Sequence, residues 1–217
     1  MTEQAPRPPG LDDLDEESWQ RLYGRWDGLT PSAVAALLDG APFRWWIAGG
    51  WAASVAAGKA RRHDDTDVAV LVRDLEDVRA WLAAFHLWEP HDGTLRPLLA
   101  GDSLGPGREQ LWVRRDADSP WILDLALTPT DGEEWLFKRD HSVRLPVDEI
   151  GQTLDGVPYL RPCVVFLYKA RRQRPKDDAD FALALPQLPD DDRVWLARAL
   201  DKVHPGHPWR DVLWTAG

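Results

Sequence analysis

The chain has 217 residues, of which 44% are hydrophobic, so it can bury a sizeable core and is not expected to be mainly disordered. Its formal net charge of -10 argues against a nucleic-acid partner, which is bound through Lys and Arg, and suits a small cationic ligand. The single cysteine, Cys163, excludes an intrachain disulfide, and no apolar run has the length of a signal-peptide core or a membrane span. We therefore expect a cytoplasmic protein that does not contact a membrane.

The first part of the chain predicts a tail followed by two helices. Residues 1–14 are rich in Pro and polar side chains, and we expect them to be disordered. The spacing of apolar residues predicts a short helix within Leu14–Arg25. A second helix is expected after Thr30, a good N-cap, with Pro31 at its first position and Gly40 at its end.

A strand, a helix and a second strand are predicted next. Trp45–Ala48 and Val68–Val72 are short apolar runs typical of buried strands, and an Ala-rich segment lies between them. That segment is typical of a helix packed closely on a sheet. Gly49 and Gly50, at the end of the first strand, allow the backbone to approach a phosphate, and the helix N-terminus supplies free N–H groups.

Two carboxylates stand where the second of these strands begins. Because side chains alternate along a strand, Asp65 and Asp67 point the same way and Thr66 points the other way. Two carboxylates on one face repel each other unless a cation lies between them. Mg²⁺ prefers oxygen ligands of this kind. The plain alternative is a solvated acidic turn, helped by Asp64, but the apolar run that follows favours a metal site. A phosphate cradle beside a metal site is what phosphoryl or nucleotidyl transfer needs.

The middle of the chain adds a third carboxylate. We expect an amphipathic helix over Asp74–Trp88, mostly loop over Pro90–Gly107, and a hairpin of strands Gln110–Arg114 and Trp121–Leu127. Asp124 lies inside the apolar run of the second hairpin strand. A lone Asp in a buried strand costs free energy unless it is paired or bound to a metal. Asp124 is therefore either satisfied by backbone donors or an Arg, or part of the metal site.

Short strands and then helices are predicted for the rest of the chain. In chain order we expect strands within Val143–Ile150 and Val157–Leu160, helices over Pro162–Ala170, Asp177–Leu185 and from Asp190, and an irregular tail over His204–Gly217. This pattern indicates a tail over residues 1–14, an α/β domain over 15–150 and a helical C-terminal domain over 151–217. The substrate cleft is expected between the two domains, where ligand sites often lie.

These features together resemble a known family. A strand that ends in a Gly pair, a helix and then Asp-x-Asp are similar to the signature of the DNA polymerase β-like nucleotidyltransferase superfamily. Within it, GGWA followed by RRHDDTD most resembles aminoglycoside 2''-adenylyltransferase and its relatives. The later stretch PYLRPCVVFLYKARRQRPKDDADFALALPQL resembles a second block of those relatives, so the resemblance spans roughly Phe43–Leu188.

The resemblance implies a fold and a set of site residues. The fold would be α/β (α+β), a nucleotidyltransferase-type mixed β-sheet flanked by helices, with a small helical C-terminal part. Asp65, Asp67 and Asp124 would hold two Mg²⁺ ions, and Asp124 would also be the general base. The groups that would bind the triphosphate of ATP or another nucleoside triphosphate are Gly49, Gly50, Arg62 and Lys169. The acceptor would be a hydroxyl of a small cationic molecule, such as an aminoglycoside antibiotic.

Other functions stay open at this point. A toxin-type nucleotidyltransferase could modify a tRNA or a protein, although the deficit of basic residues argues against tRNA. A catalytically silent nucleotide-binding sensor is the second alternative, and the three Asp residues argue against it. Gly50 stands where many superfamily members have Ser, so one phosphate-directed hydroxyl is missing. For Lys169, the plain alternative is an exposed helix lysine.

Overall fold

The computed structural model describes residues 15–59, 61 and 63–215. The predicted tail over 1–14 and the predicted phosphate ligand Arg62 therefore lie outside the described residues. The helices are α1 (Glu16–Tyr23), α2 (Pro31–Leu37), α3 (Gly49–Ala56), α4 (Leu75–Trp81), α5 (Pro162–Lys169), α6 (Pro175–Ala184), α7 (Asp190–Val203) and α8 (Pro208–Thr215). The strands are β1 (Trp45–Ile47), β2 (Asp67–Leu71), β3 (His86–His91), β4 (Thr94–Pro97), β5 (Gln110–Arg114), β6 (Trp121–Thr128), β7 (Thr130–Asp131), β8 (Glu134–Phe137), β9 (Asp140–Pro146), β10 (Gly151–Leu154) and β11 (Val157–Leu160).

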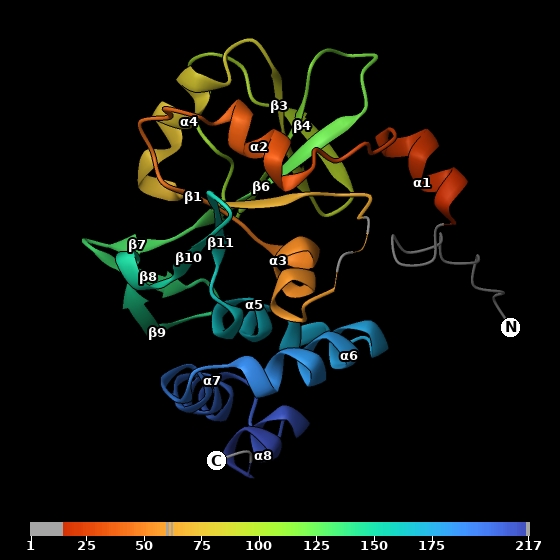
Figure 1. The fold of residues 1–217 in the computed structure, drawn as a ribbon. Coiled ribbons are helices and arrows are strands. Elements are labelled where there is room, and N and C mark those ends of the chain that lie inside the picture. The colour runs from red at the N-terminus through yellow and green to blue at the C-terminus, as the bar shows by residue number, and fades with distance from the viewer. Residues whose placement is uncertain (1–14, 60, 62, 216–217) are drawn as a thin grey trace, which may run out of the picture.

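Eight of these strands form one mixed sheet in the order β10-β11-β1-β2-β6-β5-β3-β4. β2 and β6 are parallel neighbours, whereas β1 and β2 are antiparallel. β7, β8 and β9 form a second, three-stranded sheet. Figure 1 shows the main sheet with α2 and α4 near one end and the C-terminal helices at the other. The predicted fold class, a mixed β-sheet flanked by helices, is confirmed.

The central strands form because their side chains are apolar on both faces. Residues 68–71 of β2 and 121–125 of β6 are all buried, as expected for strands covered from both sides. The Ala-rich α3 buries Ala52 and Ala53, and their small side chains let it pack closely on β2 and α5. Thr30 caps α2 as predicted, because its hydroxyl accepts from the backbone N–H of Ala33 at 3.3 Å.

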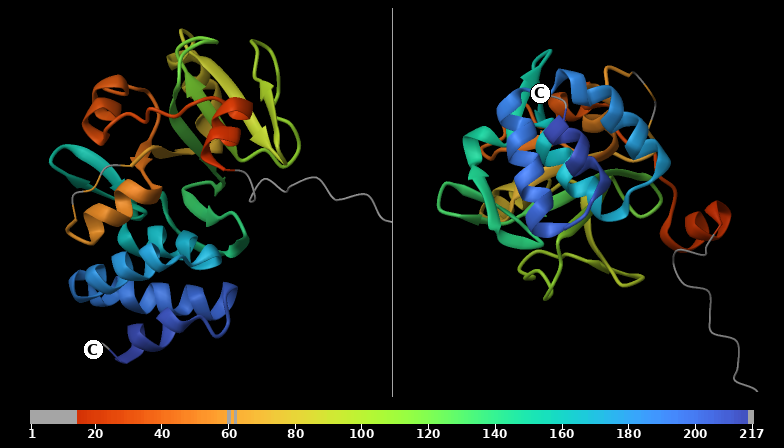
Figure 2. Two further views of the ribbon diagram at one scale, coloured as in Figure 1. Left: turned by 90° about the vertical axis from the view of Figure 1, so that its right-hand side faces the viewer. Right: turned by 90° about the horizontal axis from the view of Figure 1, so that it is seen from below.

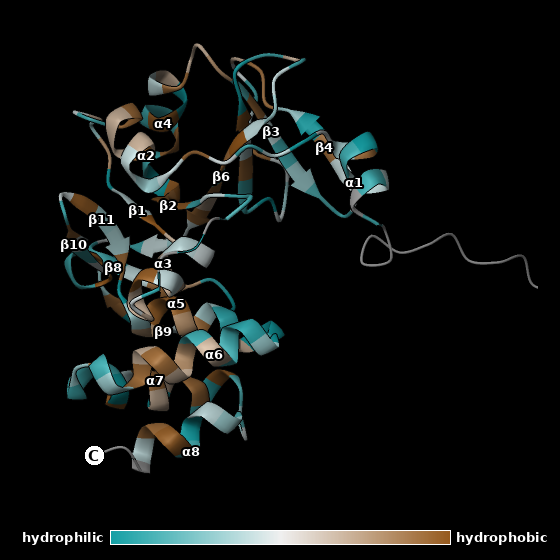
Figure 3. Cartoon of the chain, turned by 45° about the vertical axis from the view of Figure 1, so that its right-hand side comes forward, coloured by the Kyte–Doolittle hydropathy of each residue, from teal (hydrophilic) through white to brown (hydrophobic). Residues whose placement is uncertain are grey.

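The C-terminal helices pack beneath the sheet through a buried apolar face. α5 buries all of residues 163–167 and contacts α3 and α7. The left view of Figure 2 shows these helices below the strands. The hydrophobic parts of α5 and α7, brown in Figure 3, lie inside this group of helices. None of the helices in the described part of the chain is long and apolar enough to cross a membrane.

Two predictions between residues 74 and 107 are wrong. The helix expected over Asp74–Trp88 ends at Trp81, because residues 86–88 pair as an extended strand with residues 112–114 of β5. The loop expected over Pro90–Gly107 contains the β3–β4 hairpin instead. The fully buried Glu89 stabilises it, because this carboxylate accepts from Arg96 Nε at 2.7 Å and from the Gly105 N–H at 3.0 Å.

Two predictions near the C-terminus also need correction. The α/β domain was expected to end at residue 150, but its sheet continues past this residue. β10 and β11 join the sheet, and β11 lies parallel to β1. The tail expected to be irregular contains helix α8. Its Trp209 is buried, stacks on Phe181 at 4.4 Å between ring centroids and donates Nε1–H to Asp178 at 2.7 Å. These contacts lie on α6, so packing against another helix orders the tail.

Candidate active site

Two of the predicted carboxylates meet on adjacent strands. Asp67, the first residue of β2, is in register with Asp124 of the parallel strand β6. Registered residues of neighbouring strands point to the same face of a sheet, so the two side chains lie side by side. The backbone N–H of Asp124 donates to the Thr66 carbonyl at 2.9 Å, which holds this register.

The two oxygens of the Asp124 carboxylate have different surroundings. Oδ2 accepts a hydrogen bond from Gln110 Nε2 at 2.8 Å. Oδ1 is buried and has no hydrogen-bond partner among the described residues. An unpartnered buried carboxylate oxygen is costly, and it is the kind of group that a cation or a substrate proton satisfies.

Gly49 brings the start of α3 against the Asp67 carboxylate. Its φ of +55° is a conformation that suits glycine, and a Cβ there would lie 1.5 Å from Asp67 Oδ2. The Gly50 N–H also faces this carboxylate and lowers its pKa. The Gly pair predicted as a phosphate cradle therefore packs on the carboxylate of Asp67. Its contact with phosphate stays a prediction.

The carboxylates oppose each other's ionisation. Burial, together with the charge of Asp65, raises the pKa of Asp67 to about 6, against the opposing charge of Lys169. Burial and then the charge of Asp67 raise the pKa of Asp124 well above its ordinary value. A bound cation would reverse both effects, because it favours the ionised forms.

Asp67 and Asp124 together fit a divalent cation, whereas the third predicted ligand, Asp65, lies on an exposed turn. Asp65 is exposed on the turn before β2, although its charge acts on both other carboxylates. Among the described residues, no group of three or more His, Cys, Asp or Glu side chains is arranged to hold a metal ion. The residues that fit are Asp67 and Asp124, with two hard carboxylates and one unpartnered oxygen. Asp65 as a ligand stays a prediction.

Lys169 lies at the same site, at the end of α5. Its side chain is 9% exposed, so the plain interpretation as an exposed helix lysine is wrong. Nζ forms an ion pair of 2.8 Å with Asp177 Oδ1, and Arg174 Nε bonds Asp177 Oδ2 at 2.8 Å. Burial opposes ionisation of Asp177, but the bonds from Arg174 and Lys169 outweigh it and lower its pKa to about 2. Asp177 therefore holds two cationic groups near the carboxylates.

A cavity of about 230 Å³ opens beside Asp67. It lies between one face of the sheet, α5 and the turn between β8 and β9. The lining residues that carry polar or aromatic groups are Asp67, Gln110, Thr128, Lys138, Arg139, Tyr168 and Lys169. Sequence reasoning missed Gln110, Lys138, Arg139 and Tyr168. Gln110 could have been predicted, because it lies on the hairpin strand expected to pair with the strand of Asp124.

A polar network supports the turn that precedes Asp65. His63 Nε2 and Ser54 Oγ are 2.8 Å apart, and Arg61 donates to Ser54 and forms an ion pair of 2.8 Å with Asp180. The His63 ring fills the space beside Gly50, where a Cβ would meet its Nδ1 at 2.5 Å. Burial and the charge of Arg61 lower the pKa of His63. His63 therefore has a structural role, because it holds the turn before Asp65 against α3.

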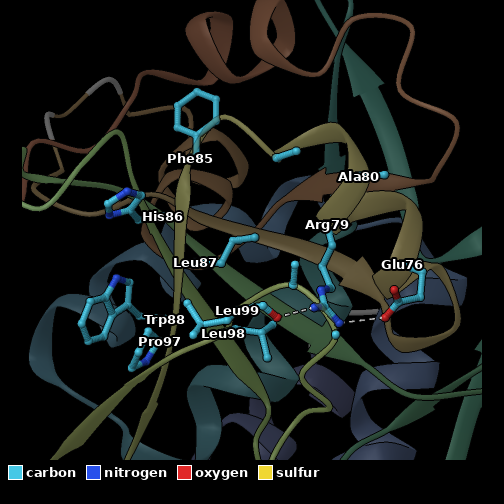
Figure 4. A pocket seen from close by; sticks show the side chains of 13 residues that line it. Glu76, Arg79, Ala80, Phe85, His86, Leu87, Trp88, Pro97, Leu98 and Leu99 are labelled. Atoms are coloured by element: carbon cyan, nitrogen blue, oxygen red, sulfur yellow. Dashed lines mark hydrogen bonds and ion pairs between the residues drawn. The ribbon is translucent and has the colours of Figure 1, made fainter.

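A larger cavity, of about 610 Å³, lies away from these carboxylates, between α4 and the β3–β4 hairpin (Figure 4). Its main polar group is already bonded, since Arg79 donates to Glu76 at 3.0 Å and to the Leu99 carbonyl at 2.7 Å. None of the predicted site residues that the structure describes lines it. Its size is therefore not a reason to place the chemistry there.

The raised pKa of Asp67 predicts how stability depends on pH without metal. The folded protein binds this proton more tightly than the unfolded chain, so its stability falls as pH rises between about 4 and 6. Asp67→Asn removes the effect and should stabilise the metal-free protein at pH 7 by roughly 1–3 kcal/mol. Urea unfolding in EDTA at pH 7 and pH 4 measures this. A variant less stable than the parent at pH 7 would contradict it.

The order of the sheet, the registered carboxylates and the helix that begins at Gly49 define a nucleotidyltransferase-type fold. It is similar to the crystal structure of ANT(2'')-Ia in complex with adenylyl-2''-tobramycin, with a TM-score of 0.50 and 15% identity over 79% of this chain and 97% of that one. The solution structure of the antibiotic-resistance factor ANT(2'')-Ia matches with a TM-score of 0.51 and 17% identity, over 79% of this chain and 89% of that one. The crystal structure of the lincosamide antibiotic adenylyltransferase LnuA with bound lincomycin has a TM-score of 0.48 and 13% identity, over 73% of this chain and 98% of that one.

The sequence points the same way. The model of the aminoglycoside-2''-adenylyltransferase family matches residues 32–97, and no curated protein matches the chain. The matched segment contains Gly49, Gly50, Asp65 and Asp67, while Asp124 and Lys169 lie beyond it. The predicted resemblance is confirmed: over residues 32–97 the chain is similar to the aminoglycoside-2''-adenylyltransferase family.

Proposed function

We propose that this chain is a nucleotidyltransferase that moves a nucleoside monophosphate, AMP, from a nucleoside triphosphate to a hydroxyl of a small cationic acceptor. The observation that carries the proposal is the register of Asp67 with Asp124, which pairs a half-buried carboxylate with a buried one and leaves Oδ1 of Asp124 unpartnered. An aminoglycoside is the acceptor class that the family match and the solved complex with adenylyl-2''-tobramycin support. The net charge of -10 favours such a cation.

Asp124 would act as the general base. Its carboxylate would take the proton of the acceptor hydroxyl, whose oxygen attacks the α-phosphorus as the bond to the β-phosphate breaks and pyrophosphate leaves. Asp67 and Asp124, with Asp65 as a further ligand, would hold Mg²⁺, which neutralises charge on the triphosphate and the attacking oxygen when bound. Lys169 and the backbone at Gly49 and Gly50 would orient the phosphates.

A pyrophosphate-release assay tests this function. Each nucleoside triphosphate is combined with a panel of aminoglycosides and lincosamides, with Mg²⁺ or with EDTA, for the parent chain and for Asp67→Asn. We expect release that needs one donor, one acceptor class and Mg²⁺, and that disappears in the variant. Nucleotide binding by calorimetry without release from any acceptor would overturn the proposal in favour of a macromolecular target or a sensor.

Lys169→Met should weaken donor binding. The substitution removes a cation beside the cavity, and Asp177 keeps its bond to Arg174, so the helix is expected to stay folded. We expect the KM for the triphosphate to rise about tenfold, in line with the loss of one charge-assisted hydrogen bond. Lys202→Met, at a lysine that donates to the Ser142 carbonyl on the surface, is the matched control. Equal KM values in the two variants would argue against a phosphate contact.

A further inference from the structure

Asp124 lies between two different kinds of neighbour. In the sheet order, β6 stands between β2, which carries Asp67, and β5, which carries Gln110 and Trp112. Trp112 is in register with Asp124 in the antiparallel β5–β6 pair, so its side chain lies on the same face. Gln110 is two residues before Trp112 and shares that face. One side of Asp124 thus meets a carboxylate and the other meets two hydrogen-bond donors.

Both donors are directed at the Asp124 carboxylate. Gln110 Nε2 donates to Oδ2 at 2.8 Å. Trp112 is in register with Asp124 and so lies on the same face of the sheet, and its indole N–H lowers the pKa of the Asp124 carboxyl. Yet neither Trp112 Nε1 nor Asp124 Oδ1 has a hydrogen-bond partner among the described residues, and both atoms are buried. A buried donor and a buried acceptor left open beside each other are uncommon in folded proteins.

The Trp112 ring is held in its orientation by other aromatic rings. Its centroid lies 5.2 Å from that of Trp26 and 5.5 Å from that of Trp121, both in edge-on geometry. Trp19 lies 6.4 Å away. Such packing locks a rotamer, so the direction of the N–H group is set before any ligand binds.

We propose that Gln110 and Trp112 are positioning residues that hold the Asp124 carboxylate from the β5 side and aim it toward Asp67. In the reacting complex the Asp124 carboxylate turns so that Oδ1 accepts from the fixed Trp112 N–H while Oδ2 keeps its bond from Gln110. A carboxylate has about four acceptor sites, so two donors on one side leave the others for a cation and for the acceptor proton. Both donors are neutral, and the charge of Asp124 is therefore kept. The inference rests on the proposed function, because Asp124 is its base.

The test compares Trp112→Phe with Trp26→Phe. Both changes remove an indole N–H and keep an aromatic ring, but only the first faces Asp124. We expect Trp112→Phe to lower kcat about 10- to 100-fold, the effect of losing a hydrogen bond to a charged group, with the KM for the triphosphate within about twofold. Gln110→Met should act in the same direction.

Binding of Mn²⁺ to the nucleotide-free protein, followed by electron paramagnetic resonance, separates this inference from the proposed function. If the parent chain transfers nothing, the proposed function fails, but weaker Mn²⁺ binding in Trp112→Phe than in Trp26→Phe still supports the positioning role. Equal kcat values and equal Mn²⁺ affinities in the two variants would show that the indole only packs. A parent chain that neither transfers nor binds Mn²⁺ overturns both.

Discussion

Asp124→Asn is expected to lower kcat for nucleotidyl transfer by at least about a thousandfold, because an amide neither accepts the hydroxyl proton nor binds a divalent cation well. The fold should survive. The backbone bond from residue 124 to Thr66 does not involve the side chain, and the amide oxygen can still accept from Gln110. Removal of one buried charge also ends its repulsion with Asp67. We therefore expect a melting temperature equal to or above that of the parent, measured by calorimetry in EDTA.

Asp131→Asn is the matched control for this variant. Asp131 is an exposed residue of β7, so the substitution makes the same change of charge away from the carboxylate pair. Single-turnover release of pyrophosphate should be unchanged in Asp131→Asn. If Asp124→Asn kept a rate within tenfold of this control, Asp124 would not be the base.

Gly49→Ala is expected to remove activity and destabilise the protein together. A Cβ at this position would lie 1.5 Å from Asp67 Oδ2, and φ is +55°, so the new methyl must push the carboxylate away from Asp124. We expect a loss of roughly 2–4 kcal/mol in the free energy of unfolding, from backbone strain and overlap together. Urea unfolding measures the stability, and pyrophosphate release measures the activity.

Gly132→Ala separates the two causes. Gly132 has nearly the same φ, +56°, but a Cβ there meets nothing within 4 Å. It should cost only the strain of the left-handed backbone, about 1–2 kcal/mol, and leave transfer unchanged. Equal losses of stability in the two variants would mean that the contact between Gly49 and Asp67 contributes nothing.

Local patterns predicted the elements whose stability is local. Thr30 and Pro31 marked the start of α2, because capping depends on neighbouring backbone groups alone. The hairpin of β5 and β6 followed from two apolar runs around a polar turn. The helix expected over Asp74–Trp88 failed from residue 82 onward, because the periodicity of a single segment does not reveal that β5 offers residues 86–88 a strand partner.

The residues of the candidate site also fall into two groups, those that a local pattern predicts and those that only strand pairing brings together. Asp67 and Asp124 were predicted because a carboxylate in or beside a buried apolar strand is conspicuous in any sequence. Gln110 and Trp112 looked like ordinary residues of a hairpin strand. They became site residues only when pairing with β6 turned them toward Asp124. Lys169 was predicted by resemblance, whereas its ion pair with Asp177 was found only in the structure.

Neighbouring residues suffice to predict a carboxylate pattern typical of a metal site, a Gly turn before a small-residue helix, and enough apolar residues for a mixed sheet. These properties reside in neighbouring residues, so they can be read without knowledge of the fold. The folded structure was needed to show that Asp67 stands in register with Asp124, that Gly49 touches the carboxylate of Asp67 and that Asp65 stays exposed. Register between strands more than fifty residues apart depends on which faces the whole core buries, and no local pattern contains that choice.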